Sequence, residues 1–537
     1  MGIASTVFSR RALLVLVGWA AALLLAHHTA ILSGMRIVQG DEGDVRFNHY
    51  VMEHGWRNVT GQPMHARFWD PPMFHPEPNV VAYSDVLLGV APFYWAWRAI
   101  GLGEDAAWQA WVLTMTSLNF LAAVWLLTRG LGLRLGPAVV GAVLFCVGAP
   151  RLNQINHPQL VGQFFALLAI GAVLELLRPE TNRRRGLAWA GLLVGSGVAQ
   201  LYAGFYWGWF LFFFLLVAGG VALATRDMRP RLLAALRTHG PALVLFGAVG
   251  VAVLVPLVLH SRQAIQAVGL RNFSEAESMV PRFWSWFYLG QASWLYGWME
   301  PFRQFQRLPL PWEHRLGLGL VTTVVAGLGL WHARDRLAVR LLLVVTVVTV
   351  LLSTRYTGGH TPWFLVFKLV PGAGAIRAVS RIGVWLLIPA GVGLALFLQR
   401  KLAEGRTALA VGVGALCLLE QGVGGRDSGF DRFESRADVL ALAERVRPEC
   451  ASFFYEPTGG DFPDYKYQLD AAWAAMVAGV PTVNGYSGNW PPGWKLHDNR
   501  RFDTAAAARL DTGLEAWARS RGLPLERICR IEERARR

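Results

Sequence analysis

The sequence predicts a polytopic α-helical membrane protein, with about eleven membrane-spanning helices and a small α/β domain at its C-terminal end. The composition is the first observation: 54% of the 537 residues are hydrophobic and 16% are charged, whereas a soluble domain carries about 25% charged residues. Many apolar runs approach the ~20 residues that cross a bilayer. Short basic clusters lie between these runs, as the positive-inside rule expects.

The candidate spans follow one another along most of the chain. The first, residues 12–32, follows Arg10 and Arg11 and exceeds the apolar core of a signal peptide, so a retained helix is expected. Segment 87–100 would invert every later loop if it crossed the membrane, so we predict an interfacial or re-entrant helix there. The other candidates are residues 106–128, 136–150, 159–177, 186–202, 204–225, 240–260, 314–332, 339–353, 382–398 and 407–421.

Loop charge predicts the orientation of these spans in an inner membrane. With a cytoplasmic N-terminus, every cytoplasmic connection carries at least two basic residues, whereas the outer connections near 151–158 and 203 are short and nearly uncharged. An odd number of spans then places the C-terminal tail outside. The other outer segments are a long first loop, 34–105, and the loops 261–313 and 354–381.

A change of composition near residues 422–430 predicts a domain boundary. Glycine-rich sequence there leads into a polar tail of ordinary globular composition, with a strand-like run at 451–455. We therefore predict a transmembrane domain at 1–425 and a soluble extracytoplasmic α/β domain at 426–537.

Cysteine content and net charge narrow the function classes. Four cysteines are too few for a disulfide framework. Cys450 and Cys529 lie in the tail, where an oxidising compartment could pair them, and two free thiols are the alternative. The net charge is +15, but the basic residues are spread between apolar runs and form no single patch, so no nucleic-acid partner is expected.

Three carboxylates in four residues follow the first span, in the sequence Gly-Asp-Glu-Gly-Asp at 40–44. Such a cluster can hold a divalent metal, Mg²⁺ or Mn²⁺, or supply a general base. The glycines let the backbone turn sharply and approach a ligand. Asp41 and Asp44 are therefore the candidate catalytic residues and possible metal ligands. A solvated acidic turn is the alternative.

Other polar residues are predicted on the same side of the membrane. A proline-stiffened loop at 69–78 and the following Tyr-Ser-Asp could present His75 and Asp85 at the membrane surface. His157, at the outer end of the third span, could orient a substrate or a proton. For all three residues a purely structural role is the alternative.

Two arginines precede the tenth span. Arg377 and Arg381 follow glycine-rich backbone that begins at Pro371, and in a helix they would share one face. The positive-inside rule disfavours basic residues outside, so the presence of this pair requires an explanation. One explanation is that the arginines bind a phosphate or diphosphate. The alternative is an ion pair with the first-loop carboxylates.

The order of these motifs resembles a group of bacterial multi-pass proteins similar to the type-C (GT-C) glycosyltransferase superfamily. The likeness runs from about Gly40 to Trp490, over most of the chain. At the second motif position this chain has His75 where the group is expected to have tyrosine. The motifs are GDEGD at 40–44, FHPEPN at 74–79, YSD at 83–85, NHPQL at 156–160, residues 372–381, and NGYSG at 484–488.

The resemblance implies sugar transfer from a polyprenyl-phosphate or polyprenyl-diphosphate donor at the outer face of a bacterial inner membrane. Asp41 best matches the acidic residue that serves such enzymes as base or metal ligand, and Asp44 is next. Arg377 and Arg381 match the residues that bind the donor phosphate, with His157, Asp85 and His75 as further substrate contacts. Membrane lipid and a glycan, lipid or protein acceptor in cell-envelope assembly are the other expected partners.

Two other functions compete with this hypothesis. The first is a lipid or sugar transporter or flippase, but the spans contain few acidic groups and no internal repeat is apparent. The second is a non-catalytic envelope assembly protein whose outer tail binds a partner. Loss of transfer on substitution of Asp41, with folding retained, would favour an enzyme.

Overall fold

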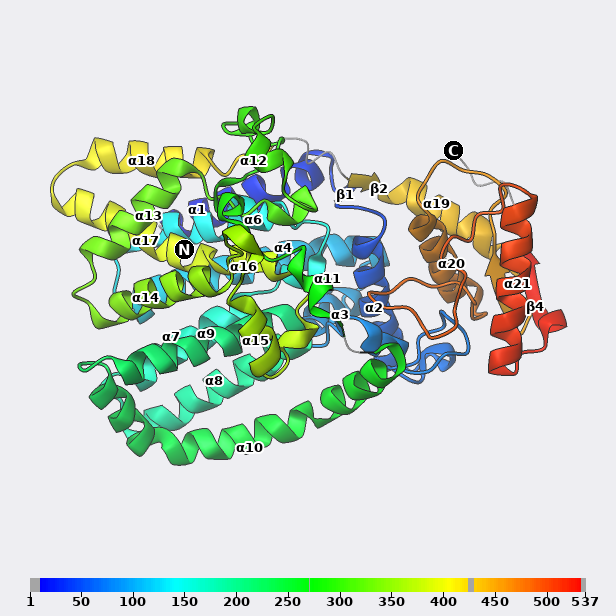
Figure 1. Ribbon diagram of the computed structural model, residues 1–537, viewed down its shortest axis with the longest axis horizontal. Coiled ribbons are helices and arrows are strands. Elements are labelled where there is room, and N and C mark those ends of the chain that lie inside the picture. Colours follow the sequence, from blue (N-terminus) through cyan, green and yellow to red (C-terminus); the bar gives the residue numbers. More distant parts are fainter. Residues whose placement is uncertain (1–9, 270, 424–428, 533–537) are drawn as a thin grey trace, which may run out of the picture.

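The computed structural model, which describes residues 10–269, 271–423 and 429–532, is a helical bundle that carries a smaller mixed region at one end (Figure 1). Eight of its described helical segments are long and apolar enough to cross a membrane, and three further apolar helices are shorter. Each predicted span overlaps one of these helices, and the count of eleven spans stays a prediction. The helices are α1 (Arg10–Leu32), α4 (Glu104–Trp125), α5 (Leu135–Val147), α7 (Phe164–Leu176), α8 (Arg183–Ala203), α9 (Phe205–Ala224), α10 (Arg229–Val268), α13 (Leu320–His332), α14 (Leu337–Leu352), α17 (Leu387–Ala403) and α18 (Thr407–Leu419).

Helix α17 lies at the centre of the bundle, and small residues let its neighbours approach. A Cβ atom added to Gly391 would stand 2.7 Å from the carbonyl oxygen of Gly141 in α5. One added to Gly393 would stand 2.3 Å from the carbonyl oxygen of Ala326 in α13. Within a membrane, such close backbone packing takes the place of the hydrophobic effect as the force that joins helices.

Two predicted spans differ from their helices in extent. Residues 240–260 form only the middle of α10, whose 40 residues would be roughly 60 Å long. The helix also includes basic residues outside the predicted span, such as Arg229 and Arg237. The span predicted at 314–332 begins later, at Leu320, because Gly319 has φ +84°, a left-handed conformation that an α-helix excludes. The apolar segment 87–100 forms α3 (Ala91–Ala99), which is too short to cross a membrane.

The smaller region confirms the small C-terminal sheet expected from the sequence. Strands β3 (Ser452–Tyr455) and β4 (Ile528–Ile531) pair in parallel, with Ser452 opposite Ile528. Around them lie α19 (Arg432–Ala443), α20 (Asp464–Ala478) and α21 (Thr504–Arg521). The structure pairs Cys450 with Cys529 in a disulfide, which joins the start of β3 to β4.

The segments predicted to lie outside meet at the end of the bundle that carries this region, here called the loop end (Figure 1). Strand β1 (Ile37–Gln39), which follows α1, pairs antiparallel with β2 (Gly429–Asp431), which precedes α19. The backbone N–H of Ser380 donates to the carbonyl oxygen of Met279 at 2.9 Å. These long-range contacts agree with the topology inferred from loop charge.

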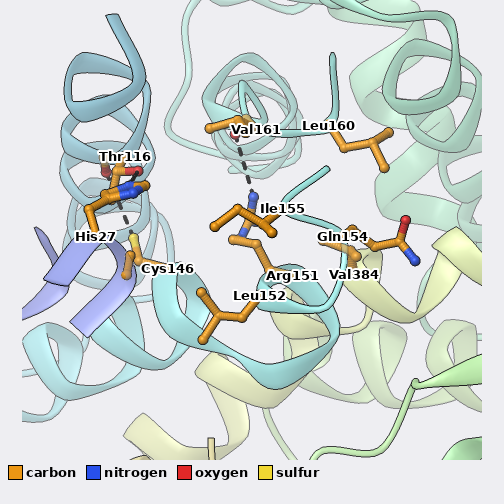
Figure 2. Close-up of a pocket in the computed structure, with 11 residues that line it drawn as sticks. His27, Thr116, Cys146, Arg151, Leu152, Gln154, Ile155, Leu160, Val161 and Val384 are labelled. Atoms are coloured by element: carbon orange, nitrogen blue, oxygen red, sulfur yellow. Dashed lines mark hydrogen bonds between the residues drawn. The ribbon is translucent and has the colours of Figure 1, made fainter. Parts of the chain in front are cut away.

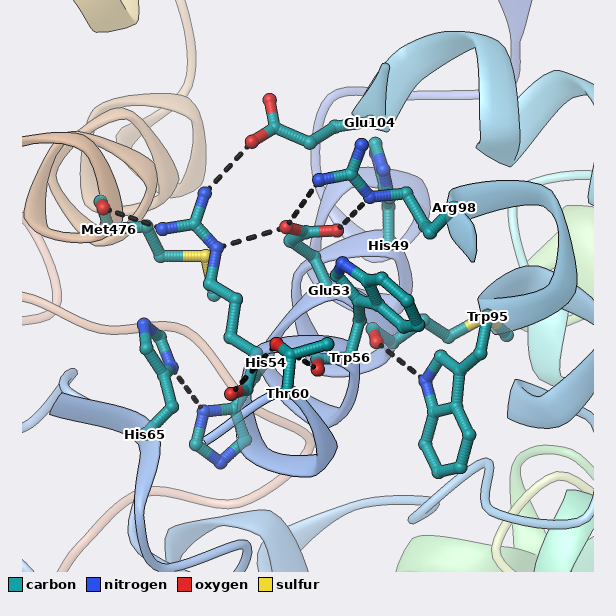
Figure 3. A network of polar contacts seen from close by, with 12 residues as sticks. His49, Glu53, His54, Trp56, Thr60, His65, Trp95, Arg98, Glu104 and Met476 are labelled. Atoms are coloured by element: carbon teal, nitrogen blue, oxygen red, sulfur yellow. Dashed lines mark hydrogen bonds and ion pairs between the residues drawn. The ribbon is translucent and has the colours of Figure 1, made fainter. Parts of the chain in front are cut away.

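Helix α2 (Asp44–Val59) is fixed at the loop end by a network of buried charges (Figure 3). The fully buried carboxylate of Glu53 accepts hydrogen bonds from Arg57 at 2.9 Å, Arg98 at 3.0 Å and the Tyr94 hydroxyl at 2.8 Å. Arg57 also donates to Glu104 of α4 and to a carbonyl oxygen of α20. Because an unpaired buried charge would cost several kcal/mol, roughly 3–5, the network holds α2 in one position between α3, α4 and α20.

Candidate functional site

Asp44 begins α2 and lies at the centre of the candidate site. Its Oδ1 accepts a hydrogen bond from the Tyr486 hydroxyl at 2.7 Å, and its Oδ2 lies 3.7 Å from Nε2 of His157. The pKa of Asp44 is raised, because the effect of burial exceeds the opposing effects of the Tyr486 hydroxyl and of the charges of Arg381 and Arg377. A carboxylate at a helix N-terminus also faces the positive end of the helix dipole.

Asp41 lies beside Asp44 on the turn that leads into α2. Its Oδ1 accepts a hydrogen bond from the Gly43 N–H at 3.0 Å. Burial, and then the charge of Asp44, raise the pKa of Asp41 to about 6. Gly40 makes this turn with φ +101°, and a Cβ atom there would lie 3.3 Å from Oδ1 of Asn156. The turn therefore packs directly against the segment that carries His157.

The third carboxylate of the cluster points elsewhere. Glu42 lies 4.0 Å from Arg46, and the charges of Arg46 and Lys466 oppose the rise that burial causes in its pKa. Arg46 itself pairs with Asp470 of α20 at 2.7 Å. Glu42 thus belongs to the contact between α2 and the C-terminal region, and the site holds two carboxylates.

The two arginines reach the site by different routes. The chain between the short helical turns at Ala373–Ala375 and Val379–Arg381 is not helical, so the shared helical face considered from the sequence does not exist. Arg377 is exposed and, within the described part of the chain, makes no hydrogen bond or ion pair. Both arginines nevertheless act on the charge of Asp44.

Arg381 is buried and held in place. Its guanidinium lies 4.7 Å from the centre of the Tyr206 ring and 3.8 Å from Glu313. Its Nε has no hydrogen-bond partner. The ion pair of Arg381 is therefore with Glu313, and the first-loop carboxylates act on it only through their field.

His157 faces Asp44 from the connection between α6 (Ala149–Leu152) and α7. Burial, with the charges of Arg381 and Arg377, lowers the pKa of His157 well below its usual range, so its imidazole is neutral. Its Nδ1 and the neighbouring Oδ1 of Asn156 are buried without hydrogen-bond partners. Two unpaired polar atoms thus lie next to the carboxylate pair.

Asp85 and His75 take structural positions. Oδ1 of Asp85 accepts a hydrogen bond from the Phe205 N–H at 2.7 Å and caps the start of α9, although the charges of Arg381 and Asp44 also act on it. The backbone of His75 bonds to Thr482 at 2.9 Å and to the indole of Trp517 at 3.0 Å. The structure therefore brings together Asp41, Asp44, His157 and the two arginines, with Asp85 at the edge and His75 on the C-terminal region.

A small cavity lies beneath this group, inside the bundle (Figure 2). Its volume is about 40 Å³, enough for a few water molecules and too small for a sugar. Arg151 lines it and donates to Gln163 at 2.6 Å and to the carbonyl oxygen of Phe145 at 3.1 Å. These hydrogen bonds of Arg151 support the turn at residues 151–157, so we assign the cavity a structural role.

Tyr486, Tyr206 and Glu313 are site residues that sequence reasoning did not single out. Tyr486 lies in the NGYSG motif of the tail, so the motif marked its position although its role as the donor to Asp44 depends on tertiary structure. Tyr206 and Glu313 had no signal, because an aromatic residue in a span and a glutamate in a loop are both common.

The carboxylates have only part of the ligand set that a divalent cation needs. In the described residues no group of three or more His, Cys, Asp or Glu side chains is placed to hold a metal. Asp41 and Asp44 could supply two carboxylates to a cation otherwise bound by water and substrate, as Mg²⁺ commonly is.

Neither a protein-family model nor a curated protein matches the sequence, but solved structures match the fold. The arabinofuranosyltransferase AftD from mycobacteria aligns with a TM-score of 0.51 and 14% identity, over 88% of this chain and 31% of its own. The oligosaccharyltransferase of Archaeoglobus fulgidus in its apo form aligns with a TM-score of 0.52 and 12% identity, over 90% of this chain and 65% of its own. ArnT from Cupriavidus metallidurans aligns with a TM-score of 0.42 and 16% identity.

This chain thus spans less than two thirds of the length of AftD and of the oligosaccharyltransferase. At such low identity the likeness is one of fold. The chain is a multi-pass membrane protein with the GT-C-like fold of these glycosyltransferases.

Proposed function

We propose that the chain is a membrane glycosyltransferase, which moves a sugar from a polyprenyl-phosphate-linked donor to an extracytoplasmic acceptor in cell-envelope assembly. The observation that carries the proposal is the neighbouring pair Asp41 and Asp44 at the loop end of a GT-C-like bundle, with Arg377 and Arg381 near enough to act on the charge of Asp44. A base and a cation at the membrane boundary are the groups that this transfer requires.

In the proposed reaction the bond between C1 of the sugar and the phosphate oxygen breaks, and a bond from C1 to the acceptor oxygen forms. The acceptor hydroxyl gives its proton to a carboxylate of the pair. The polyprenyl phosphate leaves with the bonding electrons, and its negative charge faces the arginines. Arg377, exposed and unpaired among the described residues, would move onto the phosphate at little cost.

Within the pair, we assign proton transfer to Asp41. Its pKa of about 6 lies close to the operating pH, which makes a carboxylate both available and basic enough to act. Asp44, which accepts a hydrogen bond from the Tyr486 hydroxyl and lies 3.7 Å from Nε2 of His157, would position His157 and the acceptor hydroxyl. Since the two carboxylates interact, they titrate as a pair.

Binding a divalent cation, Mg²⁺ or Mn²⁺, is the alternative role of the carboxylate pair, because a carboxylate that binds a cation is not free to accept a proton. When bound, the cation would neutralise charge on the phosphate as the donor leaves. The residues that would hold it are Asp41 and Asp44.

We propose that the chain lies in a bacterial inner membrane, with a cytoplasmic N-terminus and an outward-facing C-terminal region. The disulfide supports the outward placement of the C-terminal region. Disulfides persist in oxidising compartments and are rare in the cytosol, and the Cys450–Cys529 pair lies in the C-terminal region. The adjoining loop end also exposes tryptophan, as at Trp294 and Trp298, which is typical of a membrane interface.

The test is a transfer assay with purified protein in liposomes. The liposomes contain lipid-linked sugars extracted from source cells grown on radioactive monosaccharide, and a cell-surface extract supplies the acceptor. We expect label to pass from the organic-soluble lipid into a new glycosidic product. Movement of labelled lipid across the bilayer without any new glycosidic bond would contradict the proposal and favour a transporter.

A further inference from the structure

An aromatic surface of the C-terminal region adjoins the candidate site and is not used by the proposed transfer step. Trp490 is 37% exposed and stacks on the buried Trp494, with ring centres 5.3 Å apart and planes 9° apart. The exposed His497 lies edge-on to both rings, 4.5 Å from Trp490. Together with Tyr486 and Tyr465 these residues are called the aromatic shelf.

The shelf is rigid. The indole of Trp494 donates to the carbonyl oxygen of Val483 at 3.1 Å. Asn489, next to Trp490, donates to the carbonyl oxygen of Tyr83 at 2.9 Å and accepts from Arg271 at 2.9 Å. A flat ring held in this way loses little conformational entropy when a ligand covers it.

The shelf is continuous with the carboxylate pair. The ring of Tyr486 lies 6.1 Å from that of Trp490 and 6.2 Å from that of Tyr465, while its hydroxyl bonds to Asp44. Tyr465 in turn packs over the Asp41 turn, since a Cβ atom added to Gly43 would lie 3.2 Å from its ring. An elongated ligand on Trp490 would therefore reach the carboxylates over an unbroken aromatic surface.

We propose that the aromatic shelf binds sugar rings of the acceptor, so that the acceptor of the proposed transferase is a glycan. A sugar ring has one face of C–H groups, which the negative face of an aromatic ring attracts, and a rim of hydroxyls that needs polar neighbours. Asn489, which precedes Trp490 in the chain, and His497, whose ring lies 4.5 Å from that of Trp490, provide such neighbours. This inference rests on the proposed function, because it names the acceptor of the same site.

The other acceptor classes fit the shelf less well. A peptide in an extended conformation is usually held by the main chain of a sheet edge, and residues 484–499 form no strand. A lipid would need a continuous apolar groove, whereas the Tyr486 and His497 rings beside Trp490 carry polar groups.

The first experiment measures binding without transfer. Purified protein is titrated with the glycan fraction released from the surface of the source organism, and separately with its surface protein and lipid fractions. We expect the glycan fraction to bind and Trp490→Ala to raise the Kd about tenfold, from the loss of one stacking contact. Trp490→Phe, which keeps a ring, should restore most of the affinity.

Trp298→Ala is the matched control, because Trp298 is 62% exposed on the 261–313 segment and belongs to no part of the shelf. It should bind glycan like the wild type. Thermal unfolding of each variant, with the disulfide intact, distinguishes loss of the shelf from loss of the fold. Binding of protein or lipid in place of glycan, or equal glycan affinity of wild type and Trp490→Ala, would overturn the proposal.

The second experiment separates the shelf from the transferase. In the transfer assay, Trp490→Ala should raise the KM for the glycan acceptor about tenfold and keep kcat within about twofold. Asp41→Asn should lose transfer and still bind glycan, and adding Trp490→Ala should weaken that binding as it does in the wild type. If wild-type protein binds glycan through Trp490 and never transfers label, the proposed function fails and the shelf is a glycan-binding surface.

Discussion

At the scale of single residues, the pKa of Asp41 sets the expected pH dependence of the reaction. Burial and the charge of Asp44 hold its proton to about pH 6, and only the ionised carboxylate can accept a proton. The transfer rate should therefore rise with pH, reach half its maximum near pH 6 and level off above pH 7. A pH–rate profile checks this, and a rate that falls across this range would contradict the assignment.

The two arginines should respond differently to loss of charge. Arg377 makes no hydrogen bond or ion pair with the described residues, so Arg377→Gln should fold normally. The variant should raise the KM for the lipid-linked donor at least about tenfold, because one charged contact with the phosphate is lost. Arg381 is buried against Glu313 and Tyr206, so Arg381→Gln leaves Glu313 without its cation and should lower the yield of folded protein. Donor kinetics and size-exclusion chromatography measure the two effects. A normal donor KM in folded Arg377→Gln would remove this residue from the site.

The chemistry of the residue types could be predicted from the sequence. Asp41 and Asp44 were predicted from three carboxylates in four residues, and the arginines were predicted from basic charge outside, which the positive-inside rule disfavours. The different roles of Arg377 and Arg381 could not be predicted, because they follow from a difference in burial. That burial depends on the packing of Tyr206 and Glu313 from distant segments.

At the scale of elements, the glycines of α17 determine how closely the central helices pack. A methyl group at Gly393 would meet the carbonyl oxygen of Ala326 at 2.3 Å, and the backbone on both sides cannot move aside. Gly393→Ala should therefore destabilise the bundle by about 1–3 kcal/mol. In thermal unfolding, Gly412→Ala in α18 is the control, since nothing lies within 4 Å of its added carbon. An unchanged unfolding temperature in Gly393→Ala, or an equal fall in both variants, would show that this contact does not determine the stability of the bundle.

Apolar runs predicted where the helices lie, since length and hydropathy decide which segments enter lipid. They did not predict that α10 continues to Val268, where Gly269 with φ +87° ends it, because the apolar run stops at the polar residues His260, Ser261 and Arg262 although the helix continues.

The disulfide reports on the side of the membrane to which the C-terminal region is exported. In intact cells, Cys450 and Cys529 should be oxidised, so a membrane-impermeant maleimide should label the chain only after reduction. The buried Cys146 and Cys417 should stay unlabelled in both cases. Labelling of Cys450 without reduction would contradict the disulfide, and absence of labelling after reduction would contradict the outward placement.

At the scale of the whole molecule, the function depends on segments that are far apart in the chain. Asp44 lies near the N-terminus, His157 follows α6, the arginines precede α17 and Tyr486 belongs to the C-terminal region. Loop charge predicted that all of these segments share one side of the membrane. It could not predict their contacts, which require the pairing of β1 with β2 and the docking of α2 on α20.

The central claim is that Asp41 and Asp44 act as one unit in sugar transfer. The most direct test is single-turnover transfer of labelled sugar by Asp41→Asn, Asp44→Asn and the double variant, all shown to fold and to bind donor. The account predicts that each single variant slows transfer at least about 100-fold, and that the double variant is no slower than the slower single one. Transfer at the wild-type rate in Asp41→Asn and Asp44→Asn would contradict it.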